Sequence, residues 1–290
     1  MIPPPFEYAA PKTIPEAIAL LDQDSSAKIL AGGQSLIPLM KFRLASPAFL
    51  VDINRIDGLE YIHEEGDWLR IGALTRESTL DQSALVHTRY PLLADTTHLI
   101  ADPTVRNLAT LGGNLSHADP ANDHPAAMLA YGAQVAVVGP RGSRTIPVDR
   151  FFTGPFESVL AHDEILTEIR IPVPKPFSTG AYVKMERRVG DFATAAVAVQ
   201  LRLDGSGQCL TAGIGLTNVG LTPIKAHAAE QILVGRRLDD SLIREAARLA
   251  GEAADPQDDQ RGSGDYKRFL VRTLTVRALR SALGRMNGGM

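Results

Sequence analysis

Two pairs of adjacent glycines are the residues of this 290-residue chain best suited to bind a ligand through the backbone. They lie in Ala31-Gly32-Gly33-Gln34-Ser35, the first glycine segment, and in Thr110-Leu111-Gly112-Gly113-Asn114, the second glycine segment. Glycine has no Cβ, so a phosphate can come close to backbone N–H groups, and glycine accepts the positive φ of a strand-to-helix turn. Each segment ends just before a helical pattern. Together they predict two halves of one phosphate cradle, which suits a dinucleotide pyrophosphate.

The polar side chains of the first glycine segment support this interpretation. Gln34 offers an amide and Ser35 a hydroxyl, and a helix that starts here would add unpaired N–H groups and the positive end of its dipole. For this segment alone, a bend that only turns the chain is the simpler alternative. The second segment strengthens the ligand hypothesis, because Asn114 follows Gly113 as Gln34 follows Gly33.

Other cofactor and catalytic motifs are missing from the sequence. No Gly-x-Gly-x-x-Gly fingerprint follows the expected strand at residues 28–30, which disfavours a Rossmann nicotinamide site, and no Walker lysine is present. No Gly-x-Ser-x-Gly elbow occurs either. Cys209 lies at the edge of an expected strand, where a buried inert thiol is a better interpretation than a nucleophile. We therefore assign no catalytic residue to this chain.

A third polar group lies downstream, in Asp119-Pro120-Ala121-Asn122-Asp123-His124-Pro125. It places carboxylates, an amide and an imidazole at an expected helix N-terminus. For Asp119, helix capping and ligand contact are equally good interpretations, whereas Asp123 favours contact with a ribose or adenine edge. A metal site that includes His117 is conceivable but disfavoured, since neither a His-Cys set nor a calcium-loop spacing is present.

Residues 184–193 join a cationic cluster to an aromatic side chain beside a glycine. Phe192 could stack on a flat ring, and Lys184 or Arg187 could face an electron-rich heterocycle or a phosphate. The alternative is a solvated strand end with Phe192 in the core. The sequence supports both interpretations equally.

The bulk composition limits the class of partner and the compartment. The net charge of −3 and the pI near 6.2 give no cationic field for nucleic acid or an anionic membrane surface. A single cysteine excludes an internal disulfide and leaves no thiolate set for a cluster or a structural zinc within the chain, so iron and sulfur would come from elsewhere. The N-terminus lacks a signal-peptide pattern, and no apolar run suits a membrane helix. We expect a cytoplasmic protein that a complex could dock beside a membrane.

The elements that would position these residues can be predicted from hydrophobic spacing and turn residues. In the first half we expect strands at residues 28–30, 50–53 and 68–73, with helices at 14–21, 35–40, 75–85, 92–100 and 125–131. The helix at 14–21 begins with a capping box, Thr13-Ile14-Pro15-Glu16. Strands are expected at residues 135–138, 145–147 and 165–171.

Residues 172–176, Pro172-Val173-Pro174-Lys175-Pro176, form the clearest linker. Beyond it we expect strands at 181–187, 193–203 and 210–217, followed by helices at 226–233, 241–253 and 266–283. The second of these strands is nearly all apolar and should be buried. Residues 256–264 should form a solvated loop. Strands followed by helices predict an α+β unit.

Beyond the glycine segments, the sequence contains several further short motifs. They are Phe6-x-Tyr8 with Pro15-Glu16-Ala17, Ala101-Asp102-Pro103 with Arg106, Asp119-Pro120 with Asn122-Asp123, Gly190-Asp191-Phe192-Ala193 and Gly215-Leu216-Thr217-Asn218. Over essentially its whole length, the chain resembles the FAD-binding medium subunits of molybdenum hydroxylases, the xanthine dehydrogenase family. Within that family, the likeness is strongest to the medium subunits of aerobic carbon monoxide dehydrogenases.

The resemblance implies an α+β protein in which two α/β subdomains clamp FAD, in the manner of the vanillyl-alcohol oxidase or PCMH-type fold. A C-terminal domain with a three-stranded antiparallel sheet and helices would close over the flavin. The implied boundaries are residues 1–55, 56–176 and 177–290.

The resemblance also implies which residues bind FAD. The expected set is Ala31, Gly32, Gly33, Gln34, Ser35, Leu36, Ile100, Ala101, Thr110, Gly112, Gly113, Asn114, Asp119, Asp123, Leu166, Lys184, Asp191 and Phe192. Ile100 and Ala101 would line the flavin or ribityl chain, and Asp123 would meet the adenosine half. The last three residues would face the isoalloxazine ring. A bulky residue at Gly33 or Gly113 is expected to abolish FAD retention, because its Cβ would block backbone approach to the pyrophosphate.

Two positions depart from the carbon monoxide dehydrogenase pattern. Gln34 stands where that pattern has histidine, and Phe192 stands where it has tyrosine. An amide still donates and a phenyl ring still stacks, so FAD binding should persist without the phenol hydrogen bond near the ring.

The implied function is that of the electron-exit subunit. A large molybdopterin subunit would oxidise the substrate, a small subunit with [2Fe-2S] clusters would pass electrons on, and FAD here would deliver them to an external acceptor such as a quinone or a membrane carrier. A dimer of heterotrimers is expected. The alternatives are the same subunit of a hydroxylase for a purine or other N-heterocycle, a stand-alone flavin oxidase, and a non-redox nucleotide-binding scaffold.

Overall fold

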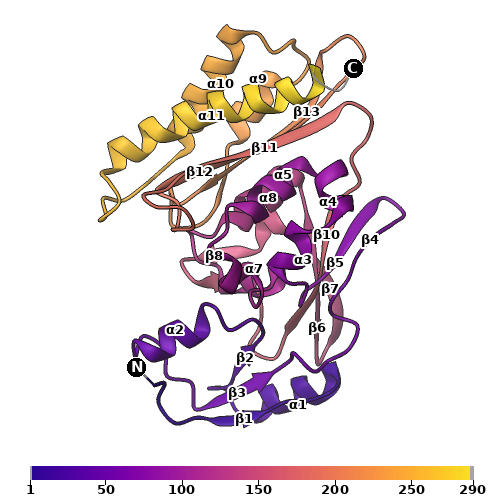
Figure 1. Cartoon of the computed structure of the whole chain (residues 1–290), viewed down its shortest axis with the longest axis vertical. Helices are drawn as coiled ribbons and strands as arrows, with labels where there is room; N and C mark the ends of the chain where they lie inside the picture. Colours follow the sequence, from indigo (N-terminus) through magenta and orange to yellow (C-terminus); the bar gives the residue numbers. More distant parts are fainter. Residues whose placement is uncertain (1, 288–290) are drawn as a thin grey trace.

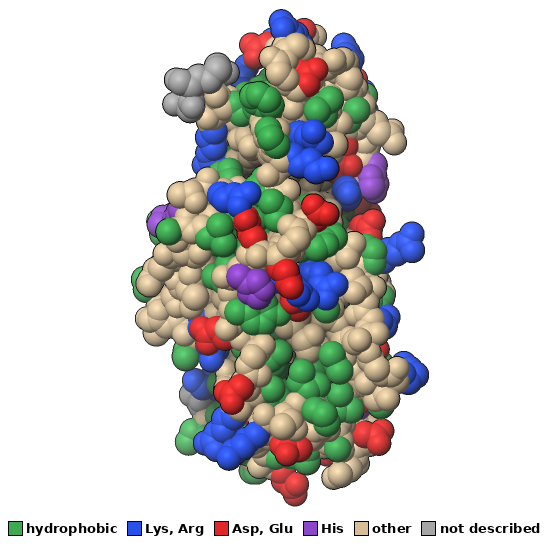
Figure 2. Space-filling model, turned by 90° about the vertical axis from the view of Figure 1, so that its right-hand side faces the viewer, with side chains coloured by type: hydrophobic (Ala, Val, Ile, Leu, Met, Phe, Trp, Pro, Cys, Tyr) green, Lys and Arg blue, Asp and Glu red, His purple; other side chains and the backbone are tan. Residues whose placement is uncertain are grey.

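The computed structural model describes residues 2–287, and three consecutive parts of the chain stack along its long axis (Figure 1). Each part contains its own main sheet, and the described N-terminal and C-terminal residues lie in the two end parts (Figure 1). Figure 2 shows acidic and basic side chains interspersed on one face of the molecule. Within the described residues, no helix combines the length and the apolar character needed to cross a membrane.

The N-terminal part is a small parallel sheet with two helices. Strands β1 (Glu7–Ala9), β3 (Phe49–Asp52) and β2 (Lys28–Leu30) pair in that order, with α1 (Ile14–Gln23) and α2 (Leu36–Lys41) as the helices. The predicted helix start is confirmed, because the Thr13 hydroxyl accepts the N–H of Glu16 at the N-terminus of α1. Ala17 and Leu21 then pack in one core with Val51 of β3.

The middle part is a five-stranded sheet whose neighbouring strands pair antiparallel. Its order is β4 (Ile62–Glu65), β5 (Trp68–Gly72), β10 (Ile165–Pro172), β6 (Gln134–Gly139) and β7 (Gly142–Pro147). The helices of this part are α3 (Glu77–Asp81), α4 (Ala84–Arg89), α5 (Pro91–His98), α6 (Pro103–Arg106), α7 (Leu111–His117) and α8 (Asp123–Tyr131). A 3₁₀ turn η1 (Val148–Arg150) and the pair β8 (Phe152–Gly154) and β9 (Glu157–Ser158) complete it.

The single helix predicted at residues 75–85 is wrong. The chain breaks between α3 and α4, and Ser83 starts the second helix by accepting the N–H of Val86 on its hydroxyl. Ser competes with a continuing helix because it bonds nearby backbone groups, so this polar position favours a new N-terminus.

The C-terminal part is an antiparallel sheet covered by helices. The three predicted strands are β11 (Ser178–Met185), β12 (Ala195–Leu203) and β13 (Cys209–Thr217), and a two-residue strand, β14 (Ile224–Lys225), extends the edge. The helices α9 (His227–Leu233), α10 (Asp240–Ala253) and α11 (Gly264–Asn287) lie at the upper end in Figure 1. The β14 pair is too short to leave a sequence pattern.

Strand β12 explains how the middle and C-terminal parts join. Its alternate residues Ala196 and Ala198 pack in the core of the middle part, while Val197 and Val199 pack beneath the C-terminal helices. A strand buried on both faces must be almost entirely apolar, as this one is. The central sheet of the C-terminal part therefore forms a shared wall between two cores.

Two glycines of β13 let this wall approach helix α8. A Cβ on Gly213 would stand 1.9 Å from the Ala130 carbonyl oxygen, and one on Gly215 would stand 2.0 Å from that of Ala126. Residues two apart on a strand and four apart on a helix each share a face, so these contacts follow one line. Helix α8, whose N-terminal end carries Asp123, is thereby fixed against the C-terminal sheet.

Candidate functional site

The first glycine segment follows β2 and turns the chain into α2. Gly33 has φ of +73°, a left-handed conformation that glycine adopts without strain. The N–H groups of residues 32–35 donate to no acceptor within the part of the chain that the structure describes. The Gln34 amide bends back to the Gly32 carbonyl at 3.2 Å. Consecutive free N–H groups in such a turn form a nest that binds anionic oxygens.

The second glycine segment differs from its prediction. Its glycines lie inside α7 rather than before a helix, because Thr110 is the N-cap and accepts the Gly113 N–H on its hydroxyl at 3.1 Å. The N–H groups of Leu111, Gly112 and Asn114 donate to carbonyls of Thr75, Ala73 and Thr110. This segment therefore offers no second row of free N–H groups.

Gly112 has a packing role in this structure. A Cβ there would stand 2.6 Å from the Ala73 Cβ and 2.7 Å from the Ala73 carbonyl oxygen. Gly112 therefore lets α7 lie directly on the end of β5, a close approach that any larger residue would prevent.

The two glycine segments nevertheless meet. A Cβ on Gly32 would stand 2.2 Å from the Leu108 carbonyl oxygen, and a Cβ on Gly113 would lie 3.8 Å from the Ala31 Cβ. Arg76 ties the same region together by donating to the Leu108 carbonyl and to the Asn54 side chain, which in turn donates to Ala31. The two segments are therefore in contact, although free N–H groups come from one segment only.

Asn114 supplies an independent sign of a ligand at this surface. Its Oδ1 atom is buried and has no hydrogen-bond partner among the described residues, while its backbone carbonyl accepts the Asn122 side chain. A buried polar atom without a partner costs free energy, so native proteins usually supply one. The unpaired N–H groups and this orphan acceptor fit a cofactor with both phosphate and hydroxyl groups.

A strained turn lies at Ile100 and Ala101, just before α6. Ala101 has φ of +48°, and Arg106 holds the turn by donating to the Ile100 and Ala101 carbonyls at 2.9 and 3.3 Å. A non-glycine residue with positive φ is uncommon and marks a functional or constrained position. A Cβ on Gly190 would stand 2.6 Å from the Ala101 carbonyl oxygen, so the β11–β12 turn packs against it.

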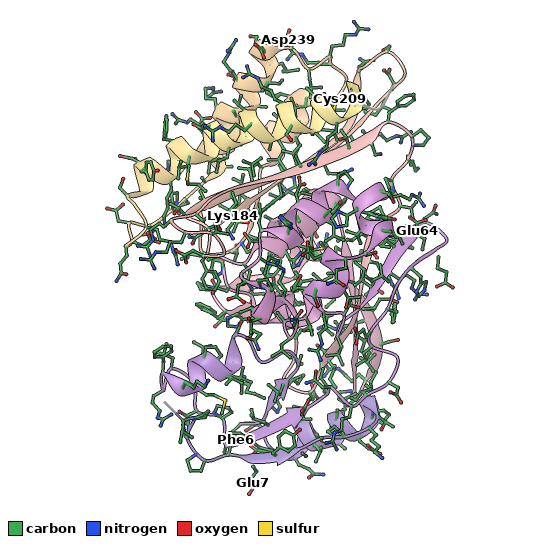
Figure 3. All side chains as sticks on the ribbon, viewed as in Figure 1. Phe6, Glu7, Glu64, Lys184, Cys209 and Asp239 are labelled. Carbon is green, nitrogen blue, oxygen red and sulfur yellow. The ribbon has the colours of Figure 1, made fainter. Side chains whose placement is uncertain are left out.

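Asp123 and Lys184 form a buried ion pair between the middle and C-terminal parts. The Lys184 Nζ lies 3.0 Å from Asp123 Oδ2 and also donates to the Leu99 carbonyl at 3.1 Å. The Tyr182 hydroxyl donates to Asp123 Oδ1 at 2.6 Å. Figure 3 labels Lys184 at the boundary between the C-terminal sheet and the helices below it.

Burial raises the pKa of the Asp123 carboxyl, and Lys184 and Tyr182 oppose that shift. Both Asp123 oxygens are already bonded inside the protein. The pair joins α8 to β11, and a contact of Asp123 with the adenosine half would use the remaining lone pairs of its carboxylate. Asp123 and Lys184 were both singled out from the sequence, but no local pattern predicts that they form an ion pair.

Three further predicted residues lie in different surroundings. Asp119 is half-buried and its Oδ1 accepts the Ala121 N–H at 2.9 Å, which is a local turn contact. Leu166 is buried in the core of the middle part on β10. Leu36 is the half-buried first residue of α2.

The ring of Phe192 is 47% exposed, so the alternative that placed it in the core is wrong. Asp191, beside it, is held by Arg261, whose two terminal nitrogens each donate to one carboxylate oxygen at 3.1 Å. This contact lowers the pKa of Asp191. Arg261 lies in the stretch predicted to be a solvated loop, and no local pattern could reveal a partner seventy residues away.

The disfavoured metal site has no support in the structure. His124 and Glu77 are both fully buried and meet at 2.7 Å between Nε2 and Oε2. Across the described residues, no group of three or more His, Cys, Asp and Glu side chains is placed to hold a metal ion. His124 is therefore a partner of Glu77, which sequence reasoning had missed.

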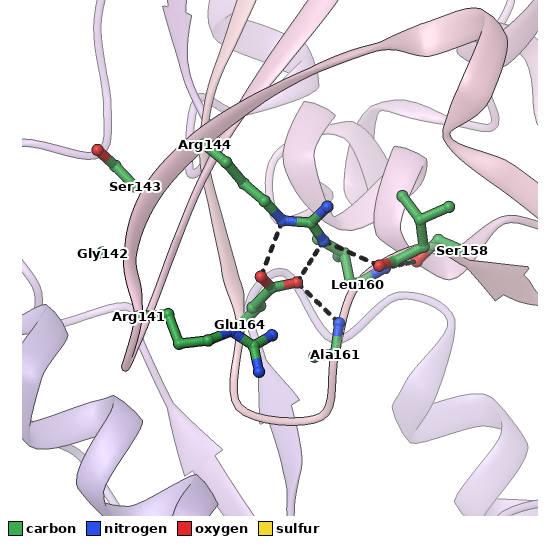
Figure 4. Close-up of a pocket in the computed structure, with 9 residues that line it drawn as sticks. Arg141, Gly142, Ser143, Arg144, Ser158, Leu160, Ala161 and Glu164 are labelled. Atoms are coloured by element: carbon green, nitrogen blue, oxygen red, sulfur yellow. Dashed lines mark hydrogen bonds and ion pairs between the residues drawn. The ribbon is translucent and has the colours of Figure 1, made fainter.

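A surface cavity of about 350 Å³ lies away from these residues (Figure 4). Arg144 and Glu164 cross it as a forked ion pair, with the guanidinium Nε and Nη2 donating at 2.9 and 2.6 Å (Figure 4). The Glu164 carboxylate also accepts the Ala161 N–H. The Arg144–Glu164 ion pair therefore joins β7 to the loop before β10.

The comparisons with known proteins agree with this fold. The family model described as the FAD binding domain in molybdopterin dehydrogenase matches residues 4–174, and the CO dehydrogenase flavoprotein C-terminal domain matches residues 180–282. The chain belongs to this family of FAD-binding flavoproteins. FAD is its cofactor, and the family consists of oxidoreductases.

Medium chains of carbon monoxide dehydrogenase are among the relatives of this chain. That of Hydrogenophaga pseudoflava is 44% identical over 286 residues, covering 98% of this chain and 99% of the relative. A solved carbon monoxide dehydrogenase from that organism, lacking the Mo-pyranopterin moiety, matches with a TM-score of 0.96 and 46% identity, covering 98% and 99% of the two chains. Caffeine dehydrogenase subunit beta of Pseudomonas sp. strain CBB1 is 36% identical over 288 residues, covering 99% and 97%.

Proposed function

We propose that this chain is the FAD-carrying medium subunit of an aerobic, molybdenum-containing carbon monoxide dehydrogenase. It takes electrons from an iron–sulfur subunit and passes them to an external acceptor. The identity to carbon monoxide dehydrogenase medium chains, 44%, exceeds the 36% to the caffeine dehydrogenase subunit, which supports carbon monoxide over a purine as substrate of the complex.

The row of free N–H groups at residues 32–35 carries the cofactor assignment. These groups would hold the pyrophosphate of FAD, with Gly33 in the left-handed conformation that aims them at one point. The Asn114 Oδ1 atom, buried and unpaired, would accept a hydroxyl of the ribityl or ribose chain. Thr110 and Gly113 would form the facing wall.

The remaining predicted residues would surround the ring and the adenosine half. Ile100 and Ala101 would line the ring from below the β11–β12 turn, and Phe192 would cover it from that turn. The Lys184 ammonium, fixed by Asp123, would contribute a positive field near the ring. We also propose direct contacts with FAD for Asp119, Asp191, Leu36 and Leu166.

Bound FAD supplies the chemistry, because it accepts electrons and releases them to a second carrier. The protein's share is to bind and orient it. Backbone N–H groups of residues 32–35 would bind the phosphates. The Asp123–Lys184 ion pair holds the C-terminal part against the middle part, and the glycine contacts keep the two segments together. No side chain of this chain has to act as an acid or base.

We propose three subdomains, residues 1–55, 56–176 and 177–290, each built on one of the three main sheets. The partners would be a small subunit with [2Fe-2S] clusters and a large molybdopterin subunit, in a dimer of heterotrimers. A quinone or another membrane carrier would accept the electrons, which would bring a cytoplasmic complex to the inner face of the cell membrane.

The test is to express the chain with its two partner subunits, purify the complex and measure flavin content and substrate oxidation. We expect one FAD per medium subunit and acceptor reduction that depends on carbon monoxide. Oxidation of a purine with no carbon monoxide activity would support the purine hydroxylase instead. Substrate turnover by this chain alone would indicate a stand-alone oxidase, and a complex without flavin would leave only a scaffold.

A further inference from the structure

Arg261 joins two loops that are far apart in the sequence. Its guanidinium donates to both oxygens of Asp191 at 3.1 Å and to the Phe192 carbonyl at 3.3 Å. The same guanidinium carbon lies 5.9 Å from the centroid of the Phe192 ring, within range of a cation–π contact. One side chain therefore holds the carboxylate, the backbone and the ring of the β11–β12 turn.

The loop that carries Arg261 is itself fixed in place. The Asp259 carboxylate accepts the Arg261 N–H at 2.8 Å and the Lys267 ammonium at 2.6 Å. The Lys267 side chain is only 3% exposed, so α11 anchors this turn from its first residues. Because its backbone is held, Arg261 loses little further freedom when it binds its partners.

The turn held by Arg261 packs against the Ile100–Ala101 turn, which the resemblance places at the flavin. Gly190 packs on the Ala101 carbonyl, which belongs to that strained turn. Asn218 fixes the other side of the turn by donating to the Ala193 carbonyl at 2.6 Å. The Phe192 ring is half exposed between these fixed points, and a phenyl ring has no hydroxyl with which to anchor itself.

We propose, on the basis of the proposed function, that Arg261 is a positioning residue that holds Phe192 over the isoalloxazine ring of FAD. It touches neither the substrate nor the reacting atoms. By fixing the ring cover, it sets how long FAD is retained and how closely a bulky external acceptor approaches the flavin.

The experiment uses the assembled complex with three variants of this chain. Arg261→Gln removes the charge, and Arg261→Lys keeps it without the planar fork. The matched control is Arg280→Gln, because Arg280 also pairs with an aspartate, Asp240, at 2.9 Å but lies toward the opposite end of α11 from the Arg261 turn. FAD dissociation, the KM for a bulky quinone and kcat with carbon monoxide are measured for each.

For Arg261→Gln we expect FAD to dissociate roughly threefold to tenfold faster, the size of effect that a partly exposed cation–π and ion-pair contact allows. The KM for the quinone should fall while kcat with excess FAD stays the same. Arg261→Lys should recover part of the loss, and Arg280→Gln should behave as the unmodified complex. Equal effects from Arg261→Gln and Arg280→Gln would overturn the proposal.

A double-mutant cycle tests whether Arg261 acts through Phe192. Phe192→Ala alone should speed FAD dissociation, and adding Arg261→Gln to it should have little further effect. Additive effects of the two substitutions would show that Arg261 acts elsewhere, and the proposal would fail. If the unmodified complex binds no FAD, the proposed function fails. If the unmodified complex binds FAD and Arg261→Gln changes neither FAD dissociation nor the KM for the quinone, the proposed function stands and this inference fails.

Discussion

Gly32 and Leu108 lie so close that a Cβ on Gly32 would stand 2.2 Å from the Leu108 carbonyl oxygen. This contact joins the loop after β2 to the turn before α7, and so brings two sequence segments into one cofactor surface. Real Cβ atoms do not approach an oxygen this closely, so the backbone must move when Gly32 gains a side chain.

Gly32→Ala should therefore separate the two glycine segments and reduce FAD content of the complex several-fold. The measurement is the ratio of flavin absorbance to protein in the purified complex. Gly205→Ala is the control, since nothing lies within 4 Å of a Cβ there. Equal FAD content in both variants would refute the role of the Gly32–Leu108 contact.

The structure adds a second reason for the effect expected at Gly33 and Gly113. A Cβ on Gly33 would contact Ile37 and Leu30 at 3.2 Å, so strain at positive φ is the main cost there. A Cβ on Gly113 would stand 2.7 Å from the Thr110 hydroxyl and would disturb the cap of α7.

Asn114→Ala should weaken FAD binding about tenfold, because a cofactor hydroxyl would lose the acceptor that the buried Oδ1 atom offers it. Titration of the FAD-depleted complex with FAD measures the affinity. The exposed Asn107, changed to Ala, serves as the control. An unchanged dissociation constant for Asn114→Ala would show that no cofactor group reaches this atom.

Breaking the Lys184–Asp123 pair should destabilise the joint between the middle and C-terminal parts. Lys184→Met leaves a buried carboxylate without its cation, which costs about 3–5 kcal/mol and lowers the apparent Tm by roughly 10 °C. Adding Asp123→Asn should recover part of this loss, because it removes the charge of the more deeply buried of the two carboxylates that pair with Lys184, while Glu186 still lacks its cation. Thermal unfolding of the complex, monitored through flavin release, measures the Tm of both variants. A double variant that is less stable than the sum of the two single effects predicts would contradict the account.

The forked contact with Arg144 lowers the pKa of Glu164 below its ordinary value of 4.5, although burial acts in the opposite direction. A carboxyl with a lowered folded-state pKa stabilises the protein above the ordinary value, and this stabilisation is lost as the pH falls through the folded-state pKa. The Tm of the unmodified chain should therefore fall more steeply below about pH 4.5 than that of Glu164→Gln. Glu7→Gln, at an exposed position, should leave the slope unchanged; parallel curves for Glu164→Gln and the unmodified chain would contradict this.

Burial raises the pKa of the Cys209 thiol to about 11, so little thiolate exists near neutral pH. We expect almost no alkylation of Cys209 in the folded complex at pH 8 and full alkylation after unfolding. Mass spectrometry of the peptide containing Cys209 gives the modified fraction. Rapid modification of the folded protein would show that the thiol is accessible.

Local signals in the sequence predicted most of the secondary structure. Thr13 and Glu16 cap α1 as the capping pattern indicated, and the apolar run of β12 is buried on both faces. These features depend on neighbours within a few residues, which is why a single sequence reveals them. The same holds for Gly33, whose left-handed conformation follows from the turn that it makes.

Features that depend on distant contacts could not be predicted in this way. Arg261 meets Asp191 across seventy residues, and His124 meets Glu77 across forty-seven. The second glycine segment looked like a turn, yet tertiary packing on Ala73 makes it part of a helix. Sequence alone named residues near the cofactor surface, while packing decided which of them have free polar groups.

The central claim is that the first glycine segment binds the FAD through which electrons leave the complex. Its most direct test is anaerobic rapid mixing of the complex with carbon monoxide while flavin and iron–sulfur absorbance are both recorded. In the unmodified complex, we predict reduction of the clusters followed by bleaching of the flavin. In Gly32→Ala, we predict reduction of the clusters with most of the flavin signal missing and loss of acceptor activity in proportion. Full flavin bleaching at the unmodified rate in Gly32→Ala would contradict the account.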